Sequence, residues 1–148
     1  MMRIRFMYLV LLLFVVTGCS IADKVNDSLN YTEEARSFIS NAARLAEQWP
    51  ALAEKAINDP GARDKLKSEL TDMKERILKF NAIEAPAFAK SVHQQLVSYN
   101  EKLMQEINVY LEKINNGAID WKSLKDSPLL DTLKQVTQIL DRVQNLAP

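Results

Sequence analysis

The helical character of the chain is clearest in residues 59–80, DPGARDKLKSELTDMKERILKF. Asp59 followed by Pro60 is a typical helix start, because a carboxylate caps free N–H groups and proline fits the first helical position. The apolar residues then recur at steps of four, three, four and three, at Leu66, Leu70, Met73, Ile77 and Phe80. This period predicts a helix over about residues 60–82 that packs nearly parallel to its neighbours.

Helical periods continue on both sides of this segment. Asp23–Gln48 is predicted as a helix, after which Pro50 either ends it or opens a short one over 51–58. Pro86–Asn116 is predicted as the longest helix, with Gly117 as its left-handed stop. Ser127 and Pro128 repeat the start signal. The stripe of the first helix is expected to contain Val25, Leu29, Ala35, Phe38, Ile39, Ala42, Leu45 and Trp49.

These patterns predict one fold class. No segment shows the apolar–polar alternation of a half-buried strand. Short connections between long amphipathic helices favour antiparallel neighbours. We therefore expect an all-α, up-and-down helical bundle of four to five helices, compact or elongated.

Composition excludes several function classes. The 148 residues include 19 basic and 19 acidic ones, a balance that argues against a dedicated nucleic-acid-binding protein. One cysteine forms neither an intramolecular disulfide nor a cysteine-rich zinc site. Three glycines leave no phosphate-binding loop. We expect no cofactor and no metal.

The first residues have the pattern of an export signal. Arg3 and Arg5 precede an apolar run over residues 6–16. This run is shorter than the ~20 apolar residues that cross a bilayer, but it suits the ~7–15-residue core of a signal peptide.

The end of that run, Val16-Thr17-Gly18-Cys19, resembles the lipobox of bacterial lipoproteins. The resemblance implies cleavage between Gly18 and Cys19 and a diacylglycerol on the Cys19 sulfur, with palmitate expected among the acyl chains. Whether the new amino group is acylated as well stays open. We then expect a signal peptide over 1–18, a lipidated N-terminus and short tether over 19–22, and a bundle domain over 23–148. An ordinary secretory signal and an uncleaved anchor helix remain the alternatives.

A second resemblance covers nearly all of residues 19–148. The motifs are Val25-Asn26-Asp27-Ser28-Leu29-Asn30-Tyr31, Asp59-Pro60, Tyr99-Asn100-Glu101-Lys102-Leu103 and Ile114-Asn115-Asn116-Gly117. They resemble a family of small, uncharacterised lipoproteins of bacilli and their relatives. The resemblance implies an extracytoplasmic address, the outer face of the cytoplasmic membrane in a Gram-positive cell, and it transfers no catalytic residue.

Few residues are candidates for chemistry. His93 has no carboxylate within one helical turn, so it is interpreted as a boundary histidine, with a metal ligand or general base as the alternative. The acidic pairs Glu33–Glu34, Asp23–Asp27 and Asp126–Asp131 are interpreted as capping or solvated residues. No nucleophile motif is present, so we expect no catalytic residues and no enzymatic activity.

Two functions stay open. The first is a non-enzymatic, lipid-anchored bundle that contacts an envelope protein, with its acyl chains in the membrane. The second is a binding module for an apolar small ligand or lipid between helices, with Ala42, Ala43, Ala46 and Ala53 lining a groove. Trp49 and Trp121 are expected to cap core layers, with docking to headgroups or a partner as the alternative.

Overall fold

The computed structural model describes the backbone of residues 19–146 and the side chains of residues 29–146. This part of the chain is all-α, as predicted, and contains no strand. Its α-helices are α2 (Cys19–Ala56), α3 (Pro60–Asn81), α4 (Lys90–Asn115), α5 (Pro128–Thr137) and α6 (Leu140–Gln144). Two 3-10 turns, η1 (Ala87–Ala89) and η2 (Leu124–Asp126), precede α4 and α5.

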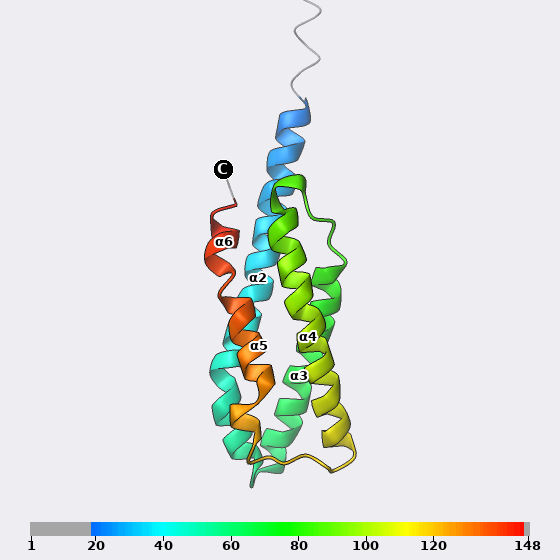
Figure 1. Ribbon diagram of the computed structural model, residues 1–148, viewed down its shortest axis with the longest axis vertical. Coiled ribbons are helices and arrows are strands. Elements are labelled where there is room, and N and C mark those ends of the chain that lie inside the picture. Colours follow the sequence, from blue (N-terminus) through cyan, green and yellow to red (C-terminus); the bar gives the residue numbers. More distant parts are fainter. Residues whose placement is uncertain (1–18, 147–148) are drawn as a thin grey trace, which may run out of the picture.

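The helices form an elongated up-and-down bundle (Figure 1). α2 packs against α3 and α5, and α4 packs against the same two helices. One end of the bundle holds the start of α2, the α3–α4 connection and α6, and we call it the Cys19 end. The α2–α3 turn and the α4–α5 connection lie at the opposite end.

α3 forms as its sequence predicts. The Asp59 side chain accepts a hydrogen bond of 2.8 Å from the Gly61 N–H, and Pro60 is the first helical residue. All five residues of the predicted stripe, Leu66 to Phe80, are buried. The helix start and its heptad period are therefore both confirmed.

Pro50 does not divide α2, contrary to both options read from the sequence. The helix continues through Pro50 to Ala56, which makes α2, and not α4, the longest helix. Trp49, Leu52 and Ala53 are all buried, so the core-facing side of α2 continues past the proline. This packing offsets the roughly 3 kcal/mol that proline costs in a helix interior.

Other helix boundaries also differ from the predictions. α2 begins at Cys19 instead of near Asp23. Pro86 has extended backbone (ψ 157°) and precedes η1, so α4 starts only at Lys90. Gly117, with φ at +66°, ends α4 as expected. The last predicted helix is split into α5 and α6.

The core is formed by aliphatic and aromatic side chains from every helix. In α2 the predicted stripe is buried from Ala35 to Trp49, but Leu29 is 50% exposed. Val25, also expected in this stripe, lies outside the described side chains. No helix in the range 19–146 is both long and apolar enough to span a membrane.

Candidate functional site

Cys19, the predicted lipidation residue, is the first residue of α2. Residues 19–22, expected as a tether, are helical in this structure. The rest of the predicted lipobox, Val16 to Gly18, lies outside the described residues. Signal cleavage and lipidation at Gly18 and Cys19 therefore stay predictions.

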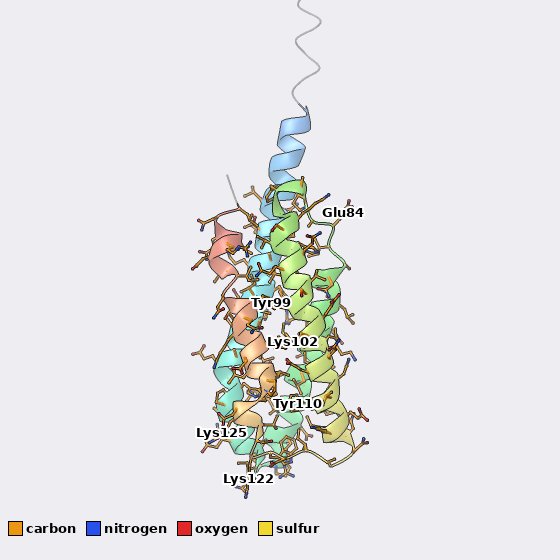
Figure 2. All side chains as sticks on the ribbon, in the orientation of Figure 1. Glu84, Tyr99, Lys102, Tyr110, Lys122 and Lys125 are labelled. Atoms are coloured by element: carbon orange, nitrogen blue, oxygen red, sulfur yellow. The ribbon has the colours of Figure 1, made fainter. Side chains whose placement is uncertain are left out.

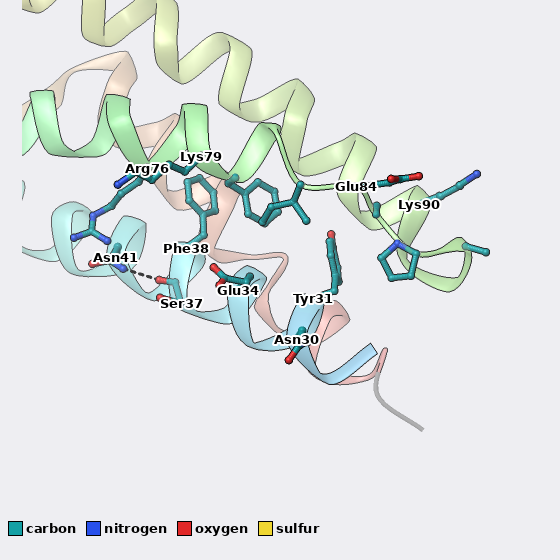
Figure 3. A pocket seen from close by; sticks show the side chains of 15 residues that line it. Asn30, Tyr31, Glu34, Ser37, Phe38, Asn41, Arg76, Lys79, Glu84 and Lys90 are labelled. Carbon is teal, nitrogen blue, oxygen red and sulfur yellow. Dashed lines mark hydrogen bonds between the residues drawn. The ribbon is translucent and has the colours of Figure 1, made fainter. Parts of the chain in front are cut away.

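An open groove lies near the Cys19 end, between α2, α3 and the connection from Ile83 to Lys90 (Figure 3). Its volume is about 980 Å³. Phe38 and Phe80 form the floor, with ring centroids 4.6 Å apart and planes tilted by 18°. Both rings are buried, so the floor offers a partner little free apolar area.

The two walls of the groove differ in chemistry. The α2 wall carries four polar residues, Asn30, Glu34, Ser37 and Asn41. The α3 wall carries two cations, Arg76 and Lys79. In Figure 3 the Glu34 side chain projects from α2 into the groove, and Arg76 reaches from α3 toward the α2 wall.

The connection between α3 and α4 closes the groove toward the Cys19 end. It contributes Ile83, Glu84 and Pro86, and Lys90 follows at the start of α4. Figure 2 shows Glu84 at this end and Lys122 and Lys125 at the opposite one. Glu84 and Lys90 therefore add one charge of each sign beside the α3 cations.

The charged residues of the groove have no ionic partner among the described residues. Just beyond the groove, Arg44 of α2 donates two hydrogen bonds to the Glu69 carboxylate of α3, at 2.9 and 3.2 Å. By contrast, Glu34, Arg76 and Lys79 form no ion pair within residues 29–146. In the described residues, an ion pair therefore joins α2 and α3 on one side of the groove, and none joins them within it.

His93 lies behind the groove floor, within a cluster of aromatic rings. Its Nδ1 is 3.2 Å from the Tyr31 hydroxyl, and its ring centroid is 5.2 Å from that of Phe80. Burial lowers the pKa of His93 and raises the pKa of Tyr31 to about 12. Both groups are therefore neutral at pH 7, and the half-buried His93 fits its interpretation as a boundary histidine.

The other candidate residues are dispersed. Trp49 is fully buried and donates a hydrogen bond of 2.8 Å to the Leu124 carbonyl, so headgroup docking is wrong for this residue. Trp121 lies under Arg63, whose guanidinium carbon is 5.1 Å from the ring centroid. Across the described side chains, no three His, Cys, Asp or Glu residues converge as metal ligands.

The alanines expected to line a groove do not do so. Ala42 and Ala53 are fully buried in helix contacts, and none of the four alanines lines the open groove. The sequence reasoning missed the groove itself. A signal was present in Asn30, Glu34, Ser37 and Asn41, which repeat at steps of four, three and four beside the apolar stripe.

Comparison with known proteins identifies the family. A model described as "Family of unknown function (DUF6376)" matches residues 31–146. The chain belongs to the DUF6376 family. A relative named "Uncharacterized lipoprotein YybP", from Bacillus subtilis (strain 168), is 34% identical over 129 residues, 87% of each chain. The expected resemblance to small lipoproteins of bacilli is confirmed. No solved structure matches the chain.

The DUF6376 match has a clear relation to the groove. It begins at Tyr31, so it includes the groove floor, the α3 wall and all of the α2 wall except Asn30. Cys19 precedes it. The groove residues other than Asn30 therefore lie within the matched range, and Cys19 lies before it.

Proposed function

We propose that this protein is a lipid-anchored, extracytoplasmic helical bundle that binds another envelope component and catalyses no reaction. The observation that carries the proposal is the continuity of α2, which runs without a break from Cys19 into the wall of the bundle. A lipid on Cys19 would be joined to the groove by a helix instead of a flexible tether.

Anchoring follows from the chemistry of lipidation. Each buried methylene contributes about 0.8 kcal/mol, and stable attachment needs two acyl chains or an equivalent second signal. A diacylglycerol on the Cys19 sulfur supplies two chains by itself. The relative named as a lipoprotein in Bacillus subtilis supports membrane anchoring, and the proposal places the anchor on the outer face of the cytoplasmic membrane.

The fold supports a binding surface held at a defined distance from the membrane. Cys19 and Tyr31 are separated by about 18 Å along α2 at 1.5 Å per residue. The groove begins at Asn30 and Tyr31, so it would be held close to the membrane. A partner in the same membrane, or bound to its surface, lies within reach.

The described side chains support binding more than catalysis. The single histidine lies against Tyr31 and Phe80, and no carboxylate among the described residues forms an ion pair with it. An apolar ligand between the helices has less support, because the walls of the described groove are polar and charged and the rings of its floor are buried.

The anchoring is tested with Cys19→Ser and a matched control, Ser20→Ala, expressed with labelled palmitate. We expect the parent and Ser20→Ala to be cut after Gly18 and to carry label, and Cys19→Ser to lose both. Cys19→Ser protein that is still cut after Gly18 and remains in the envelope would contradict the proposal.

The binding role is tested by photo-crosslinking on intact cells, with a photoreactive amino acid placed in turn at exposed positions of each helix. We expect a discrete adduct with another envelope component from at least one position. Failure of every position to give such an adduct would refute the binding role.

A further inference from the structure

We infer that the groove between α2 and α3 binds an amphipathic helix of a partner protein in the envelope. This inference rests on the proposed function and specifies its site and the chemistry of its partner. The binding residues are Glu34 and Ser37 on the α2 wall, Arg76 and Lys79 on the α3 wall, and the floor around Phe38 and Phe80.

The spacing of the α2 wall favours a helical partner. Asn30, Glu34, Ser37 and Asn41 repeat at steps of four, three and four, the period with which α-helices pack along one another. The wall runs for about 17 Å, the length of three helical turns. A helix bound in a groove usually places its apolar face on an apolar floor; here the walls are polar and charged, so the contact would rest mainly on the charged flanks of the helix.

The charges define the partner further. Arg76 and Lys79 form a cationic wall, whereas the opposite wall carries Glu34, and none of the three has an ionic partner within the described residues. A helix with acidic residues on the flank facing α3 and a basic residue on the flank facing α2 would satisfy all three. A small apolar side chain between the flanks would cover Ile83 and the edges of the floor rings.

This mixture of charges favours a protein partner over a lipid surface. An anionic bilayer attracts patches of a single positive sign. The groove instead has acidic residues as well as cations, Glu34 on the α2 wall and Glu84 in the connection. Amide side chains on the α2 wall also suit the mixed polar groups of a polypeptide.

The test uses a photoreactive amino acid at Ser37 of the full-length protein in intact cells. Ser98 is the matched control, because it is also an exposed serine but lies on α4, outside the groove. It is near the same end of the bundle, since its neighbour Asn100 donates a hydrogen bond to Asn81 at the end of α3. We expect an adduct from Ser37 and not from Ser98, and mass spectrometry should place the crosslink in an amphipathic helical segment with acidic residues.

Charge reversal tests the complementarity. Arg76→Glu with Lys79→Glu should reduce the Ser37 adduct at least tenfold. The control pair, Lys65→Glu with Lys67→Glu, also reverses two exposed cations on α3 but lies outside the groove, so the Ser37 adduct should be unchanged. Limited proteolysis of each variant in membranes verifies that the bundle is folded.

Several outcomes would overturn the inference. A Ser37 crosslink to phospholipid, or to a second copy of this chain, would replace the proposed partner. An adduct that survives reversal of Arg76 and Lys79 would remove the charge argument. If only positions outside the groove give adducts with an envelope component, the proposed function stands and this site is wrong. If no position gives one, both fail.

Discussion

The indole N–H of Trp49 donates a hydrogen bond of 2.8 Å to the carbonyl oxygen of Leu124, 75 residues later in the chain. Trp49 is fully buried, and Leu124 belongs to η2, just before α5. This bond ties α2 to the connection that leads into the last helices. It explains why a tryptophan next to a proline packs inside the bundle.

We therefore expect Trp49→Phe to destabilise the protein by about 1–3 kcal/mol, because the buried Leu124 carbonyl loses its donor. Urea unfolding followed by circular dichroism measures the change. Trp121→Phe is the control. Because Trp121 is only half-buried, this substitution should shift the urea midpoint of unfolding less. Equal effects of the two substitutions would contradict the role of this bond.

Pro50→Ala tests whether α2 is one helix. In a helix interior, alanine restores an N–H group and removes the proline ring, so we expect stabilisation of about 1–3 kcal/mol. If Pro50 instead opened a separate helix, proline would be favourable there and the substitution would be neutral or destabilising. The sign of the change in the free energy of unfolding on substitution distinguishes the two cases.

The heptad stripe of α3 predicts a contrast between two leucines. Leu70 is fully buried, whereas Leu78 is 57% exposed on the same helix. Leu70→Ala should cost about 2–5 kcal/mol of stability, and Leu78→Ala should change it by less than about 0.5 kcal/mol. Thermal unfolding of both variants checks the difference, and similar losses would mean that the stripe is misassigned.

Asp59→Ala removes the side chain that caps α3. The Gly61 N–H would lose its acceptor, and we expect a loss of about 0.5–2 kcal/mol. Asp64→Ala, an exposed residue in the same turn region, serves as the control. Asp59→Asn should retain most of the stability, because asparagine also caps helices.

The His93 environment predicts a pH dependence. Burial lowers the pKa of His93 in the folded state below its unfolded value, so the unfolded state takes up the proton first as pH falls. Its contribution to stability is complete above about pH 6.5 and declines as the pH falls through that value. His93→Gln should have a smaller loss of unfolding free energy between pH 7.5 and 5.5 than the parent protein.

The carboxylates titrate in both proteins of that comparison, so the difference between parent and variant isolates the histidine. Tyr31→Phe is a further check, because it removes the hydroxyl near Nδ1 while the ring remains in the cluster. An identical pH dependence in parent and His93→Gln would show that burial of His93 does not affect stability.

Local signals in the sequence predicted the regular part of the fold. The cap, proline and heptad stripe of α3 all act within one helix, so they could be recognised without knowledge of the tertiary structure. The path of α2 through Pro50 depends on tertiary packing around Trp49, and the sequence does not show that packing. The late start of α4 has a similar origin, since Pro86 is extended where the chain crosses the end of the bundle.

The groove could not be predicted for a related reason. It arises because α3 ends at Asn81 while α2 continues beyond it, and the chain then turns away through Ile83 and Glu84. The polar repeat on α2 was visible in the sequence, but the lack of an ionic partner for Glu34 within the described residues was not. Arg44 and Glu69 form an ion pair between the same two helices, and only the structure shows where α2 and α3 are joined by an ion pair and where they are not.

Because α2 is unbroken, the position of Cys19 also fixes the direction in which the groove faces around the helix axis. With 3.6 residues per turn, inserting one residue between Cys19 and Tyr31 would swing the groove by about 100° around the helix axis, whereas seven residues would restore its facing to within about 20°. For a partner held in the plane of the membrane, the number of residues between Cys19 and Tyr31 would therefore decide whether the groove faces it.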